Sequence, residues 1–200
     1  LSSDLILWAK GLRIYQWLKN ALLFVPLLAA HRLTDTTALV SLFWAFLAFS
    51  LCASSVYIAN DLLDLENDRQ HPRKCKRPFA SGAVSVSKGV ILGLLLFILS
   101  CLLGAYTGIA FFQWLMVYFL LTCIYSIKIK QLVLVDCMTL AILYTLRIVA
   151  GAAAVGGSMS FWLLAFSVFL FLSLAFIKRF AELQVQLLNG KQKVHGRGYI

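Results

Sequence analysis

Half of the chain's eight acidic residues lie within eight positions, from Asp61 to Asp68. Just ahead of them is Asn60, and the spacing of Asn60, Asp61, Asp64 and Asp68 places all four on one face of a helix. Like charges three or four residues apart destabilise a helix, so this row needs a compensating cation. Mg²⁺ suits it, because Mg²⁺ takes oxygen ligands from one or two carboxylates together with substrate phosphates.

The acidic row therefore predicts a site for Mg²⁺ and a diphosphate, in which Asp61, Asp64 and Asp68 are the metal ligands and catalytic residues and Asn60 supports them. The alternative is a solvated helix whose acids pair with neighbouring basic residues, as many charged segments do. We favour the metal site, because phosphate-binding residues follow the acidic row directly.

The basic half of the same segment reads RQHPRKCKRPFASG. It offers Arg73, Lys74 and Arg77 to the phosphates that the metal bridges. The commoner role of such a cluster is contact with anionic lipid headgroups, and we expect a mixture of both roles. Arg77 is the best candidate for the site, since the proline after it restricts its backbone.

Further polar residues interrupt apolar segments. Arg147 lies midway in one of them, where a charge is costly, which predicts that it binds phosphate or pairs with the acidic site. Asp136 could pair with Lys130 or with Arg147. Lys19 and Asn20 interrupt the first apolar segment, and we expect them to line a chamber.

The composition requires a membrane, because 62% of the 200 residues are hydrophobic. A helix crosses the hydrocarbon core with about 20 apolar residues, which predicts one all-α domain over residues 1–200, a polytopic transmembrane bundle of about six spans. The expected spans are 15–31, 38–59, 88–106, 108–126, 132–155 and 160–177. Pro26 should kink the first of them. We also expect the chain to be a piece of a longer protein.

The net charge of +10 sets orientation and does not indicate a nucleic-acid partner. Sixteen of the eighteen Lys and Arg residues lie before or near the start of the odd-numbered spans, or after the sixth span, which is one side of the membrane. The positive-inside rule then predicts that the N-terminus, the acidic segment and the C-terminus all face the cytoplasm. We expect the protein to lie in the inner membrane. A transporter is less favoured, because transport sites lie near the midplane and this charge lies at one face.

Two motifs resemble a known family. The stretch NDLLDLEND fits the N-D-x-x-D-x-x-x-D signature of the UbiA-type intramembrane prenyltransferase superfamily, and RPFASG resembles its R-P-x-x-S-G. The resemblance implies a bundle of roughly nine spans with a polar chamber open to the cytoplasm, of which this chain covers about the first two thirds. It also implies two aspartate-rich motifs that hold the Mg²⁺ and diphosphate of the donor.

The chain departs from the family where the second aspartate-rich motif is expected. It reads FIKRFAELQ there, with Lys178, Arg179 and Glu182 in place of an acidic row. Direct phosphate contacts by Lys178 and Arg179 would replace metal ligands, and Glu182 would orient one of them or accept from a ribose hydroxyl. Lys130, in YSIKIKQ, resembles a phosphate ligand of the family, with Lys128 second.

These segments, with QWLKN, HPRKCKRP and LRIVAGAAA, are most similar to the branch containing decaprenyl-phosphate phosphoribosyltransferase. The resemblance implies transfer of phosphoribose from its diphosphate to a polyprenyl phosphate, with a membrane lipid as partner. The alternative is transfer of a prenyl group from an allylic diphosphate to an aromatic or other acceptor.

Overall fold

A computed structural model describes residues 2–71, 74–129 and 132–188. Within these ranges all regular secondary structure is helical, which confirms the all-α prediction. The elements in chain order are α1 (Ser2–Leu12), the 3₁₀ helix η1 (Ile14–Phe24), α2 (Val25–Ala29), α3 (Thr36–Leu63), α4 (Leu65–Gln70), the short 3₁₀ turn η2 (Lys74–Lys76), α5 (Val86–Thr107), α6 (Ile109–Ile127), α7 (Val133–Ala154) and α8 (Phe161–Leu188).

Five of these helices, α3, α5, α6, α7 and α8, are long and apolar enough to cross a membrane, and they match the last five predicted spans. The first predicted span corresponds to a shorter apolar segment, Ile14–Ala29, formed by η1 and α2. A 3₁₀ helix rises about 2.0 Å per residue against about 1.5 Å in an α-helix, so this segment still covers roughly 30 Å. That length equals the thickness of a hydrocarbon core. The 3₁₀ geometry gives way to α2 at Val25, and Pro26 lies in the first turn of α2, where a proline is well tolerated. The kink expected at Pro26 stays a prediction.

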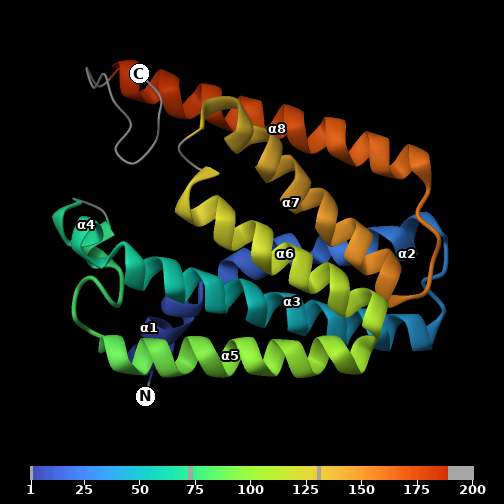
Figure 1. Ribbon diagram of the computed structural model, residues 1–200, viewed down its shortest axis with the longest axis horizontal. Helices are drawn as coiled ribbons and strands as arrows, with labels where there is room; N and C mark the ends of the chain where they lie inside the picture. Colours follow the sequence, from blue (N-terminus) through green and yellow to red (C-terminus); the bar gives the residue numbers. More distant parts are fainter. Residues whose placement is uncertain (1, 72–73, 130–131, 189–200) are drawn as a thin grey trace.

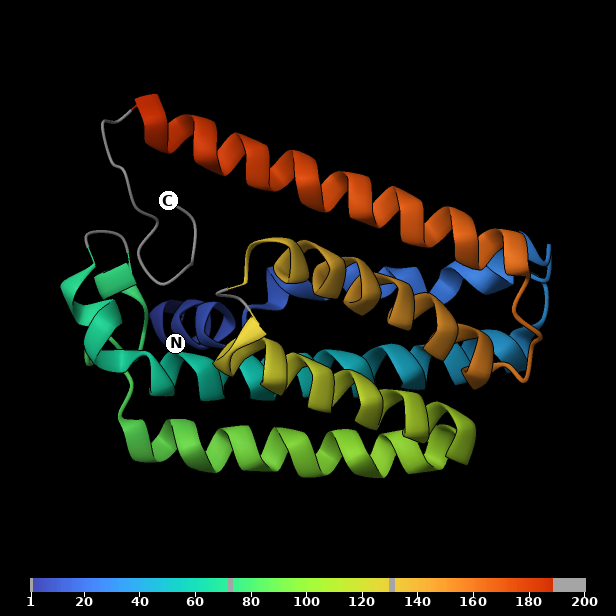
Figure 2. The same cartoon turned by 45° about the horizontal axis from the view of Figure 1, so that its top comes forward.

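The helices lie along one long axis, with α5 and α8 on opposite sides of the bundle (Figures 1 and 2). Helix α3 occupies the middle and packs on α5, α6, α7 and η1. It can be buried on several sides because small residues, among them Ala45, Ala48 and Cys52, let neighbouring helices approach. Asp35 starts this helix by accepting a hydrogen bond from the Ala38 amide, which lowers the pKa of Asp35 below its usual range.

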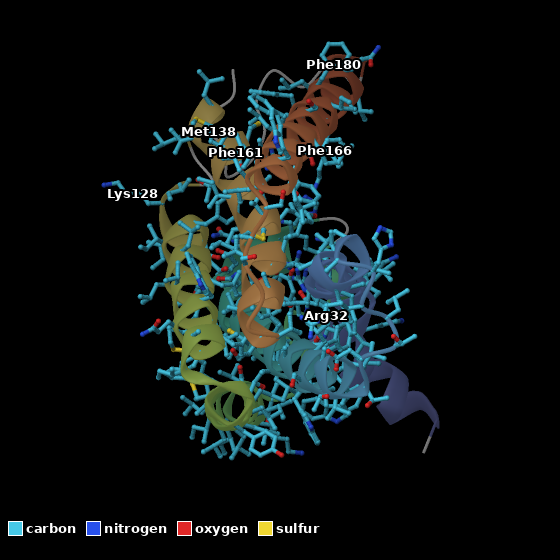
Figure 3. The ribbon with its side chains drawn as sticks, turned by 90° about the vertical axis from the view of Figure 1, so that its right-hand side faces the viewer. Arg32, Lys128, Met138, Phe161, Phe166 and Phe180 are labelled. Atoms are coloured by element: carbon cyan, nitrogen blue, oxygen red, sulfur yellow. The ribbon has the colours of Figure 1, made fainter. Side chains whose placement is uncertain are left out.

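The outer faces of the bundle are apolar. Phe166 and Phe180 project outward from α8, and Met138 projects from α7 (Figure 3). A groove of about 590 Å³ between α3, α5 and α6 is also lined almost wholly by apolar side chains. Such surfaces belong in lipid, in agreement with the predicted membrane location.

Charged segments gather at one end of the bundle. The helix α4, the N-terminus and the C-terminal end of α8 all lie at the left of Figure 1, whereas the 30–35, 108 and 155–160 connections lie at the right. Lys128 ends α6 and points away from the bundle (Figure 3). The predicted separation of basic from nearly uncharged connections is thus a property of the fold.

The acidic row is helical, with one break. Helix α3 ends at Leu63 and α4 begins at Leu65, so Asp64 lies at the junction. The backbone ladder nevertheless continues, because the Asp64 amide donates to the Asn60 carbonyl and the Asp68 amide donates to the Asp64 carbonyl. The predicted continuation of the second span into the acidic row is confirmed.

Helix α7 approaches η1 very closely at Gly151. A Cβ atom at this glycine would lie 2.0 Å from the carbonyl oxygen of Leu23, far inside contact distance. Only a residue without a side chain allows this approach. It brings the polar residues of η1 against those of α7, which matters for the sites described next.

Candidate functional site

Asp61 is buried at the end of α3 and contacts two arginines. Its side chain is 3% exposed, and its Oδ1 accepts from Arg13 Nη2 at 2.5 Å and from Arg77 Nη1 at 3.1 Å. Arg13 comes from the corner between α1 and η1, where its φ of 52° turns the chain sharply. Its guanidinium also lies over the Tyr57 ring.

Asp68, on α4, faces the same arginine. Its side chain is 1% exposed, and its Oδ2 accepts from Arg77 Nη1 at 2.5 Å. Lys74 Nζ lies 3.7 Å from its other oxygen, Oδ1, which is buried without a hydrogen bond. One nitrogen of Arg77 therefore lies between two buried carboxylates that come from different helices.

This arrangement fits a magnesium ion. The carboxylates of Asp61 and Asp68 converge on one cationic point, and Asp68 Oδ1, which accepts no hydrogen bond, is a hard oxygen donor already removed from water. In the parts of the chain that the structure describes, no three His, Cys, Asp or Glu side chains gather closely enough to hold a metal by themselves. Mg²⁺ commonly needs fewer, because substrate phosphates and water complete its shell.

The two other members of the acidic row are placed differently. Asp64 is half-buried at the junction of α3 and α4. Asn60 donates from Nδ2 to Ser126 Oγ at 2.9 Å and so ties α3 to α6. It also lines the apolar groove between α3, α5 and α6. The metal role of Asp64 and the supporting role of Asn60 remain predictions.

A second charged cluster joins α7 to α8. Arg179 is 5% exposed; its Nη2 donates to Asp136 Oδ1 at 2.9 Å and its Nε lies 2.5 Å from Asp136 Oδ2. Glu182 accepts from Arg179 Nη1, and Tyr125 donates its hydroxyl to Asp136. Pairing of Asp136 with Arg147 was the wrong expectation, because α8 packs on α7 and brings Arg179 to Asp136. The other expected partner, Lys130, lies outside the described residues.

These contacts change the expectation for the KRFAEL segment. The predicted orienting role of Glu182 agrees with its contact to Arg179, but the guanidinium of Arg179 is held by two carboxylates. Lys178 is exposed on the same helix. Of the two predicted phosphate ligands, Lys178 is therefore the one open to a ligand. Arg73 also lies outside the described residues, and Lys74 contacts Asp68 as stated above.

Arg147 forms a third cluster, within the bundle. Its Nε donates to Asn20 Oδ1 at 2.9 Å, its Nη1 to the Leu143 carbonyl at 2.6 Å and its Nη2 to the Tyr118 hydroxyl at 2.9 Å. The expected pairing of Arg147 with the acidic site is wrong, because the neutral groups of η1 and α6 surround it. Lys19 lies nearby, over the ring of Tyr144.

Sequence reasoning missed Arg13 as a site residue and used it only to orient the chain. Its contact with Asp61 spans 48 positions, and no local spacing indicates it. The signal in the sequence is weak: a single arginine two residues after Gly11, just before an apolar segment. The left-handed turn at Arg13 that folds η1 back along α3 became visible only in the structure.

Comparisons with known proteins agree with this fold and motif pattern. Residues 21–195 match the model of the UbiA prenyltransferase family. The chain is 40% identical over 192 residues to the nodulation protein NoeC of Azorhizobium caulinodans, covering 96% of this chain and 62% of that protein. It is 34% identical over 185 residues to the decaprenyl-phosphate phosphoribosyltransferase of Corynebacterium glutamicum, covering 90% of this chain and 56% of that protein.

The chain thus spans less than two thirds of the length of these curated relatives. Among solved structures, it is similar to a UbiA homologue from Archaeoglobus fulgidus bound to GPP and Mg²⁺, with a TM-score of 0.70 and 18% identity over 92% of this chain and 66% of that one. That likeness shows the fold. The family match covers most of the chain, and the chain belongs to the UbiA prenyltransferase family.

Proposed function

We propose that this chain provides the donor-binding wall of a membrane-embedded, Mg²⁺-dependent transferase. The reaction we propose moves phosphoribose from phosphoribosyl diphosphate to a polyprenyl phosphate. The observation that carries the proposal is the convergence of buried Asp61 and Asp68 on Arg77, with Arg13 beside them. The relative from C. glutamicum, named a decaprenyl-phosphate phosphoribosyltransferase, supports the choice of substrates.

Each side chain then has a role that follows from its charge and position. Asp61 and Asp68, with Asp64 beside them, would hold Mg²⁺, and a metal bound there would neutralise the charge of the diphosphate as a leaving group. Arg13 contacts Asp61, and Arg77 contacts both Asp61 and Asp68. The planar guanidinium group of each arginine can also donate two parallel hydrogen bonds to phosphate oxygens. If Mg²⁺ took the place of the arginines on these carboxylates, Arg13 and Arg77 could donate to the diphosphate.

The bond changes are those of a substitution at carbon. An oxygen of the acceptor phosphate forms a bond to the anomeric carbon of the ribose. The bond from that carbon to the diphosphate breaks, and the diphosphate leaves with the electron pair. Arg77, Arg13 and Lys74 lie beside the two carboxylates, where their positive charges can stabilise this departing charge.

A second candidate is transfer of a prenyl group from an allylic diphosphate to an aromatic or other acceptor. The carboxylate and arginine cluster suits either diphosphate, so this cluster does not separate the two donors. The cationic KRFAEL segment favours the phosphoribosyl donor, which carries an additional phosphate. Because Arg179 is paired with Asp136 and Glu182, the additional phosphate would have to be bound by Lys178, which is exposed.

The test is a reconstitution of the purified full-length protein in liposomes with Mg²⁺. One reaction contains radiolabelled phosphoribosyl diphosphate and a polyprenyl phosphate, and the other contains a radiolabelled allylic diphosphate and an aromatic acceptor. We expect a labelled lipid only in the first reaction, and none with a chelator. Product in the second reaction alone would replace our proposal with prenyl transfer.

A further inference from the structure

We propose that Lys19 and Arg147 form a second anion site inside the bundle, and that it binds the phosphate of the lipid acceptor. This assignment rests on the proposed function, because it gives one of the two proposed substrates its own site. The site is built from η1, α6 and α7, and along η1 it adjoins Arg13, the arginine that pairs with Asp61.

The guanidinium of Arg147 is buried but not neutralised. The residue is 5% exposed, and its hydrogen bonds go to an amide oxygen, a backbone carbonyl and a hydroxyl. These three bonds leave part of the five-donor guanidinium unused. The rings of Tyr118 and Tyr144, at 4.9 and 5.3 Å from its Cζ atom, add only a weak electrostatic compensation.

Lys19 brings a second positive charge to the same place. Its Nζ atom lies 5.8 Å from the centre of the Tyr144 ring, which Arg147 also contacts. Lys19 is half-buried, so it forms the more accessible side of the cluster. Asn20, the next residue along η1, accepts from Arg147 and donates to Ser50 on α3, which fixes the distance between η1 and α7.

No carboxylate balances these two cations within the described part of the chain. Neither Lys19 nor Arg147 takes part in an ion pair found among the described residues, and the pairs of Asp35, Asp61, Asp68, Asp136 and Glu182 found there go to other cations. Two uncompensated charges inside a membrane-embedded bundle are expensive, and such charges mark substrate sites. An anion that binds between them would remove this cost.

The position of the pair favours a lipid phosphate over the donor diphosphate. Lys19 follows Arg13 by six residues of 3₁₀ helix, which places its backbone roughly 12 Å deeper along η1. The donor is water-soluble, and its diphosphate fits the Asp61 and Asp68 site at the membrane face. A polyprenyl phosphate remains anchored by its chain in the bilayer, so its headgroup can reach a site below that face.

Binding of farnesyl phosphate to the purified full-length protein in detergent tests the proposal, without donor and without Mg²⁺. We expect it to raise the thermal unfolding midpoint, whereas farnesol, which lacks the phosphate, should not. Lys19→Met should weaken the affinity for farnesyl phosphate at least 10-fold. Arg147→Lys should also weaken it, because a lysine lacks the paired donors of the guanidinium group. The matched control is Lys88→Met, which removes an exposed lysine from α5 and should leave the affinity unchanged.

The ligand-free variants separate binding from folding. Because Lys19→Met removes one of two unbalanced charges, its unfolding midpoint without ligand should equal or exceed that of the natural protein. In the transfer assay it should raise the KM for polyprenyl phosphate and leave the KM for phosphoribosyl diphosphate unchanged. Equal farnesyl phosphate affinity in the natural protein and in Lys19→Met would overturn the second site.

These outcomes are distinguishable from those of the proposed function. If no phosphoribosyl transfer occurs but Lys19→Met still weakens the affinity for farnesyl phosphate, the anion site is supported and the proposed reaction is wrong. If transfer occurs and farnesol binds as tightly as farnesyl phosphate, the reaction stands and the anion site is wrong.

Discussion

At the scale of single residues, Arg77 has the most informative position in the protein. Its Nη1 atom lies between Asp61 and Asp68, two carboxylates that are both almost fully buried. Two like charges at this depth require a cation. In the structure this cation is an arginine, and in the proposed enzyme it is Mg²⁺. Metal binding and Arg77 binding therefore compete for the same carboxylates.

This competition gives a prediction that does not depend on turnover. Replacing Arg77 by Met leaves Asp61 and Asp68 repelling each other, so the unfolding midpoint without metal should fall. Added Mg²⁺ should then raise the midpoint by more than it does in the natural protein. Lys76→Met, which removes a neighbouring exposed cation, is the control and should behave like the natural protein. A Mg²⁺ shift in Arg77→Met no larger than in the control would contradict the competition.

Much of this residue-level picture could be predicted from sequence. The spacing of Asp61 and Asp68 placed them on one helical face, and the RP dipeptide indicated Arg77. Neither pattern could indicate Arg13, because its contact with Asp61 depends on a left-handed turn and on the packing of η1 along α3. For the same reason, the sequence suggested Lys130 or Arg147 as the partner of Asp136. It did not indicate the pairing with Arg179, which lies 43 positions away.

At the scale of elements, the close approach of α7 to η1 holds the Lys19 and Arg147 cluster together. Gly151→Ala should be destabilising by about 1–3 kcal/mol, because the added methyl group overlaps the Leu23 carbonyl and forces the helices apart. Gly93→Ala is the matched control, since a Cβ there would meet nothing closer than 3.5 Å. Denaturant titration in detergent should show a lower free energy of unfolding for Gly151→Ala and an unchanged one for Gly93→Ala.

The link between α7 and α8 gives a second prediction at this scale. Asp136→Asn leaves the buried Arg179 without its main counter-charge, which should cost about 3–5 kcal/mol. Glu182→Gln should cost much less, because that carboxylate is 36% exposed and water can replace it. The measurement is the unfolding free energy of both variants in one detergent. Equal losses would show that burial does not govern this cluster.

Helix type is the element-level property that the sequence predicted least well. Apolar length located the five long helices, whereas Ile14–Phe24 was expected to be an ordinary α-helical span. The hydrophobicity of a segment does not distinguish a 3₁₀ helix from an α-helix, and neither do the polar residues at positions 19 and 20. In the structure this segment packs on α3 and α7, and Trp17 donates a hydrogen bond to Ser54 of α3.

At the scale of the whole molecule, the charge distribution predicts the orientation in the membrane. The end of the bundle with α4 and the C-terminal end of α8 should face the cytoplasm (Figure 1). Single cysteines at two exposed positions, Ala83→Cys and Ser158→Cys, test this in a cysteine-free background. A membrane-impermeant maleimide should label only position 158 in spheroplasts. Labelling of position 83 alone would invert the proposed topology.

The membrane class and the arrangement of spans were predictable because lipid imposes strict limits on length and polarity. The partners of Arg147 were not, since an arginine in the membrane can be satisfied by an acid, by neutral groups or by a ligand. The structure shows neutral groups, Asn20 and Tyr118, which leaves phosphate binding, the other role expected for Arg147, as the proposal.

The central claim is that Asp61 and Asp68 bind the donor through Mg²⁺, and calorimetry of phosphoribosyl diphosphate binding to the full-length protein tests it most directly. We predict binding with Mg²⁺, at least about 100-fold weaker binding with a chelator, and loss of this difference in Asp68→Asn. Glu66→Gln, at an exposed position beside the site, should keep it. Equal affinity with and without Mg²⁺ in the natural protein would contradict the claim.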